Sequence, residues 1–127
     1  MPTSRGQATA TEVAPSREDA EAAVARMLEM SADARGCAVL GPGGDVLAAS
    51  GDVDRWGEAA AAFLEAADAA GERPAGHVHV ATEDGEVFAV RHRGVAMVAV
   101  SERFTLASLM LFDMRTVLRE LAASGPS

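Results

Sequence analysis

The sequence contains one cysteine, no lysine, no tyrosine, one tryptophan and four phenylalanines among its 127 residues. A single cysteine, Cys37, excludes an intrachain disulfide and any metal cluster built from several thiolates. Because Cys37 lies in the apolar run GCAVLG, we expect it to be a buried, unreactive side chain. All 11 basic residues are arginine, against 19 acidic residues, which gives a formal charge of −8. A chain without concentrated positive charge is poorly suited to nucleic acid or to an anionic membrane, and we expect neither as a partner.

Long apolar runs are also missing, and the first residues lack the apolar segment of a signal peptide, so we expect a cytoplasmic protein. The length suits one domain. Residues 1–16 have almost no large apolar side chains and are predicted to form a disordered tail. We place a single domain at residues 17–122 and a flexible C-terminus at 123–127.

Three stretches have the periodicity of amphipathic helices. The first begins after Pro15 with Ser16 as N-cap, and we expect it to end at Arg35-Gly36. The second is capped by Asp52 or Asp54 and runs to Gly71. Its wide apolar face, with Leu64 at the margin, is mostly alanine, which allows close approach of a second backbone: Trp56, Ala59, Ala60, Phe63, Ala66, Ala67 and Ala70.

A third helix is predicted to start between Ser101 and Thr105 and to end near Ala122. Its expected buried side comprises Leu106, Ala107, Met110, Leu111, Met114, Val117, Leu118 and Leu121. At about 100° per residue, Leu109 and Phe112 fall on the opposite side. We therefore name Leu109 and Phe112 as a candidate contact patch for a partner.

Five short apolar runs separated by glycine-rich turns predict strands. Residues 37–40 and 46–49 flank Pro42-Gly43-Gly44-Asp45, residues 78–82 and 87–90 flank Asp84-Gly85, and residues 95–100 follow Arg93-Gly94. Several of these runs show no polar alternation, which indicates that both faces of the sheet are covered. The predicted fold is α+β, a five-stranded antiparallel sheet with helices on both faces, in the order α-β-β-α-β-β-β-α.

In that order, the segments GCAVLGPGGDVLAASGD and VAMVAVSERFTLASLMLFDMRTVLREL resemble the roadblock/dynein light chain family, over residues 17–122. The resemblance implies a roadblock/profilin-like fold and a homodimer joined through the third strand and the middle helix. Carried onto this chain, the implied interface contains His77, Val78, His79, Val80, Thr82, Ala59, Phe63, Ala66 and Ala70. It also implies a non-enzymatic regulator or scaffold that binds a small Ras-like GTPase, without cofactor or catalytic residues of its own. Five arginines could reach such a partner but are expected to be solvated surface charges: Arg55, Arg91, Arg93, Arg115 and Arg119.

The three histidines allow a different interpretation. If Asp84-Gly85 is a two-residue turn, Val90 lies opposite His79 and His92 opposite His77, which places three imidazoles on one face. That is a possible zinc constellation, although a turn one residue longer would destroy it and no carboxylate lies near its His77 end. Edge-strand histidines that meet across a two-fold axis would instead make the dimer sensitive to pH.

The sequence thus favours a homodimeric, non-enzymatic regulatory or scaffold protein that binds a small Ras-like GTPase and possesses no cofactor. Two alternatives remain open at this point. One is a small sensor that binds a metal or ligand through His77, His79 and His92. The other is a purely structural subunit of a larger complex.

Overall fold

The computed structural model describes residues 15–51, 53–70, 76–81, 83, 85–103 and 105–123. The elements are α2 (Arg17–Met30), β1 (Ala34–Leu40), β2 (Val46–Ala49), α3 (Val53–Ala70), β3 (His77–Ala81), β4 (Glu86–His92), β5 (Val95–Ser101) and α4 (Ala107–Ala123). The predicted element order is confirmed. Four sets of predicted residues lie outside the described ones: positions 1–14 of the predicted tail, the candidate cap Asp52, the strand residue Thr82 and positions 124–127.

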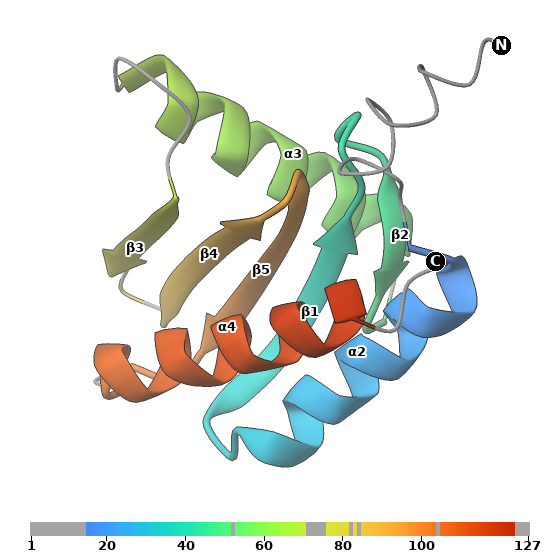
Figure 1. Ribbon diagram of the computed structural model, residues 1–127. Coiled ribbons are helices and arrows are strands. Elements are labelled where there is room, and N and C mark those ends of the chain that lie inside the picture. Colours follow the sequence, from blue (N-terminus) through green and yellow to red (C-terminus); the bar gives the residue numbers. More distant parts are fainter. Residues whose placement is uncertain are drawn as a thin grey trace, which may run out of the picture.

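All five strands form one antiparallel sheet in the order β2-β1-β5-β4-β3, so β2 and β3 are its edges. Figure 1 shows α2 and α4 together on one face of the sheet and α3 alone on the other. The predicted cover on both faces is therefore confirmed. Alternation along β1 shows why: Cys37 and Val39 join the core under α2 and α4, whereas Ala38 and Leu40 join the core under α3.

Helix α2 starts where the sequence predicts it. The Ser16 hydroxyl oxygen accepts a hydrogen bond from the Asp19 backbone N–H at 3.0 Å. The helix ends earlier than expected, because the Ser31 N–H closes the last turn on the Met27 carbonyl at 3.0 Å. The expectation that Arg35-Gly36 ends the helix is wrong, since both residues belong to β1, in which Gly36 pairs with Val100 of β5.

Helix α4 begins at Ala107, later than the predicted start between Ser101 and Thr105. The Met110 N–H donates to the Leu106 carbonyl at 3.1 Å, which makes Leu106 the N-cap residue. The prediction that Leu106 is buried is wrong, because a cap residue does not follow the helical phase and its side chain is 64% exposed. The rest of the predicted side faces inward, and Asp113 is buried beside it, which the sequence pattern did not indicate.

Cys37 is fully buried, as predicted, and its thiol lies 3.9 Å from the Val24 carbonyl oxygen. Burial raises the pKa of this thiol to about 12, because the thiolate would lose its hydration. The side chain therefore serves the core and offers no nucleophile.

Candidate interaction surface

The edge strand β3 is hydrogen-bonded on one side, to β4, within the described sheet. The Arg91 N–H donates to the Gly76 carbonyl at 3.0 Å. This bond shows which residues of β3 turn their backbone N–H and C=O groups toward β4. In antiparallel pairs the inward and outward backbone groups alternate along the strand. The N–H and C=O groups of Val78 and Val80 thus point to β4, and those of His77, His79 and Ala81 point out of the sheet.

The register of this hairpin differs from the prediction by two residues. His77 pairs with Val90, His79 with Phe88 and Ala81 with Glu86, so the connection spans residues 82–85. Gly85 is buried against the backbone of β5, where a Cβ would overlap the Ser101 carbonyl, so it cannot serve as an exposed turn residue.

The predicted pairs His79–Val90 and His92–His77 are consequently wrong. A slip of two residues keeps every side chain on its predicted face but moves His92 past His77. Among the residues that the structure describes, no group of three histidine, cysteine or acidic side chains could hold a metal ion.

The two histidines of β3 instead make contacts within the chain, on the α4 face. The His79 ring stacks on Phe88 with centroids 4.4 Å apart, and its Nε2 lies 2.6 Å from Glu86 Oε1. The other oxygen of the buried Glu86 carboxylate accepts the Thr105 N–H, just before α4, at 3.2 Å. Glu86 was missed at the sequence level because it is the diagonal neighbour of His79 only in the observed register.

Helix α3 turns one side to the sheet and an alanine-rich side to solvent. Ala60 and Leu64 are buried on the sheet, Phe63 is half-buried, and the following alanines are exposed: Ala59, Ala62, Ala66 and Ala69. The prediction that Leu64 lies at the margin of the apolar face is wrong, because the largest aliphatic side chain anchors the helix. Ala59 and Ala66 stay available to a second surface; the side chains of Trp56 and Ala70 lie outside the described ones.

One helix cannot cover this face of the sheet. Five strands at about 4.8 Å spacing span about 24 Å, whereas a helix with its side chains is about 10 Å wide. Helix α3 packs mainly on β1 and β2, which leaves part of the β3 side uncovered. Val80 is 42% exposed there, and Val78, Val87 and Val100 are only half-buried. We call these four residues the valine patch; it includes two residues of the β3 edge strand and lies on the same face of the sheet as α3.

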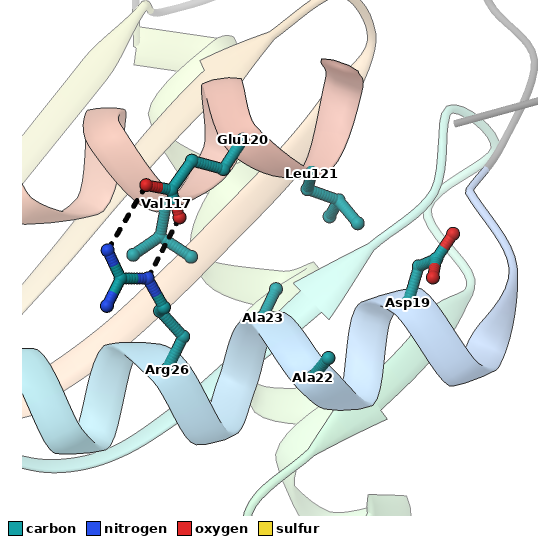
Figure 2. Close-up of a pocket in the computed structure, with 7 residues that line it drawn as sticks. All are labelled: Asp19, Ala22, Ala23, Arg26, Val117, Glu120 and Leu121. Atoms are coloured by element: carbon teal, nitrogen blue, oxygen red, sulfur yellow. Dashed lines mark hydrogen bonds and ion pairs between the residues drawn. The ribbon is translucent and has the colours of Figure 1, made fainter. Parts of the chain in front are cut away.

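Two hollows elsewhere lack the features of an active site. The first, of about 290 Å³, lies between α2 and α4 (Figure 2). Alanine, valine and leucine side chains form most of its lining, and the bidentate pair of Arg26 with Glu120, at 2.9 and 3.2 Å, lies beside them. This pair raises the pKa of the guanidinium and lowers the pKa of the carboxyl by hydrogen bonding and charge attraction.

The second hollow, of about 380 Å³, lies beside the Pro42–Gly44 turn. Arg91 of β4 donates there to both oxygens of Asp68 of α3, at 2.7 and 2.8 Å. The expectation that Arg91 is a solvated surface charge is wrong, because its guanidinium ties α3 to the sheet. Neither hollow, within the described part of the chain, places a nucleophile beside a base.

The other arginines that were expected to be solvated surface charges differ in their exposure. Arg93 and Arg119 are exposed, as expected. Arg115 is half-buried, and one of its guanidinium nitrogens lies 3.2 Å from His77 Nδ1. The side chain of Arg55 lies outside the described ones. No helix in the described residues is both long enough and apolar enough to span a membrane.

Solved structures with this architecture reveal the fold family. A Roadblock/LC7 domain from Streptomyces avermitilis superposes with a TM-score of 0.70 at 14% identity, covering 81% of this chain and 94% of that one. The chain has the roadblock fold. MglB from Myxococcus xanthus matches with a TM-score of 0.69 at 15% identity, covering 84% and 87%. Profilin from Schizosaccharomyces pombe matches at 0.61 and 16% identity, covering 84% and 99%.

The superpositions establish the fold alone, and the resemblance seen in the sequence is confirmed at that level. No protein-family model matches the sequence, and no curated protein sequence matches it either. The predicted roadblock/profilin-like class is confirmed by both kinds of neighbour.

Proposed function

We propose that this chain is a non-enzymatic regulatory or scaffold protein, which dimerises through β3 and α3 and binds a small Ras-like GTPase. The observation that carries the proposal is the uncovered part of the α3 face. The open β3 edge, the valine patch and the exposed alanines of α3 all belong to this side of the molecule. A second copy would cover all three at once by continuing the sheet and placing its α3 beside the first.

The backbone phase of β3 defines the pairing of the two copies. The backbone N–H and C=O groups that point out of the sheet belong to His77, His79 and Ala81. If the two-fold axis passes at His79, all of these groups can form hydrogen bonds with the second copy. His79 then meets His79 of the second copy, and His77 meets Ala81 in both directions. The short alanine side chains of α3 let the two helices approach to the lower end of the usual 8–10 Å range.

The GTPase half of the proposal follows from the resemblance to roadblock proteins and from the shape of such a dimer. Two α3 helices side by side form one broad surface, on which a globular partner can dock. The exposed residues of α3 are the contact candidates on that surface. No residue of this chain is assigned to catalysis, so an effect on GTP hydrolysis would arise by positioning the GTPase's own residues.

The experiment uses two matched substitutions and a purified small Ras-like GTPase from the same organism. Ala66→Arg places a charge on the exposed side of α3, and Ala22→Arg makes the same change on the exposed side of α2. We expect Ala66→Arg to be monomeric by light scattering and to lose the GTPase in titration calorimetry, whereas Ala22→Arg resembles the wild type.

Each half of the proposal can fail separately. An Ala66→Arg protein that remains a dimer would exclude the α3 interface. A wild-type dimer that binds neither the GTP-loaded nor the GDP-loaded GTPase would leave only a structural subunit.

A further inference from the structure

We propose that the outer face of α4 is a second docking surface, which binds an acidic amphipathic helix of another protein. The surface is formed by Leu106, Leu109, Phe112, Arg115 and Arg119. It lies on the opposite face of the sheet from α3 (Figure 1). Its occupant is therefore additional to the second copy and the GTPase.

The first observation is a concentration of exposed apolar side chains. The described residues hold four exposed large apolar side chains, and three of them, Leu106, Leu109 and Phe112, lie within seven positions of one another. Their exposed fractions are 64%, 54% and 59%. The spacing of three places Leu109 and Phe112 on one side of α4, with Leu106 at its cap. Isolated exposed leucines are ordinary, but a contiguous ridge with a phenylalanine is typical of an interaction site.

The packing of α4 against the rest of the protein does not involve this ridge. Helix α4 packs on α2, β4 and β5 through its other side, where Met110, Met114 and Val117 are buried. The Thr116 hydroxyl, next to the ridge, donates to the Phe112 carbonyl at 2.9 Å and is thereby bonded within the helix. The ridge thus offers apolar contact with few competing polar groups.

The charge around the ridge indicates the kind of partner. The chain has a formal charge of −8, yet Arg115 and Arg119 lie beside the ridge on α4. Of the two acidic residues of the helix, the exposed Glu120 is already paired with Arg26 of α2, and Asp113 is buried. An acidic segment would meet attractive charge here. Acidic residues elsewhere on the surface would repel this segment only weakly, because charges are screened beyond the Debye length of about 8 Å at physiological salt.

These features favour a helix over other partners. A helix can set leucines at spacings of three and four against the ridge while its acidic residues reach Arg115 and Arg119. An anionic membrane is a weaker candidate, because surface binding uses several basic residues and this face has two.

The probe is a designed, fluorescein-labelled peptide of twenty residues, which consists of glutamate, alanine and leucine with leucines at i, i+3, i+4 and i+7. Anisotropy is measured with the full chain. We expect saturable binding that weakens with added salt, and much weaker binding of a peptide with lysine in place of every glutamate. Leu109→Ser/Phe112→Ser should weaken binding at least tenfold, as loss of a central aromatic anchor typically does. Arg119→Glu should also weaken it, whereas the matched control Arg93→Glu should not.

Every other outcome overturns the proposal. Absence of binding, equal binding of the lysine peptide, or unchanged binding by the double variant would exclude the surface as an acidic-helix site. Vesicles with 30% phosphatidylserine that bind wild type but not Leu109→Ser/Phe112→Ser would make it a membrane contact. A smaller assembly of the double variant by light scattering would make it a contact between copies. Ala66→Arg separates the two proposals, because it should leave peptide binding intact.

Discussion

A proline at Ala81 tests the proposed joint between two copies most directly. Ala81 forms a non-hydrogen-bonded pair with Glu86, so its N–H takes no part in the β3–β4 ladder. In the proposed dimer that N–H donates to the backbone carbonyl of His77 in the second copy. Because of the two-fold symmetry, the second copy's Ala81 N–H makes the same bond in return. Ala81→Pro therefore removes two intermolecular hydrogen bonds and none within the protomer. Proline is tolerated at outward positions of edge strands.

The magnitude follows from these two bonds. At a net contribution of about 1 kcal/mol each, their loss weakens the dimer by about 2 kcal/mol, or roughly 30-fold in Kd. Sedimentation velocity over a dilution series measures the Kd, and thermal unfolding checks the fold. The control is Val80→Pro, which removes an inward N–H and should lower the free energy of unfolding by about 3 kcal/mol.

If Ala81→Pro is folded and its Kd stays within threefold of the wild-type value, the open edge of β3 is not the joint between copies. The same conclusion would follow if the wild-type protein were monomeric at every concentration.

Three further predictions concern the core and two buried titratable groups. Phe88→Ala should lower the free energy of unfolding by about 3–5 kcal/mol in urea titrations, because Phe88 is fully buried and also supports the His79 ring. Burial raises the pKa of Asp113, so its negative charge destabilises the folded state above that pKa, and this cost disappears when the carboxyl is protonated. Asp113→Asn should therefore raise the free energy of unfolding at pH 7. The gain should shrink toward about pH 4 in the same urea titrations. Cys37 should react with a thiol reagent only after unfolding, since its thiol is buried with a pKa of about 12, and rapid labelling of the folded protein would contradict the burial.

Much of the fold was predictable because it depends on local patterns. The Ser16 cap, the glycine-rich turn after Leu40 and the unbroken apolar strands each specify an element through neighbours in the sequence. The exposure of Leu109 and Phe112 was predictable for the same reason, since the 3.6-residue period separates them from the buried side of α4.

The candidate site was predicted less completely. The β3–β4 register depends on how Gly85 packs against Ser101 of β5, a contact between residues that no short motif relates. The Arg91–Asp68 and His79–Glu86 contacts depend in turn on which elements stack and in what register. Long-range pairing of this kind leaves no periodic trace in the sequence.

The sequence by itself thus determined the elements, their order, the covered faces and the exclusion of a disulfide. Only the tertiary structure decided that the three histidines do not form a metal-holding group, that α3 turns alanines outward, and that part of one sheet face stays uncovered. The physical reason is that a side-chain period specifies which side of an element is apolar. What covers that side is decided by the packing of whole layers, where a single helix is narrower than the five-stranded sheet beneath it.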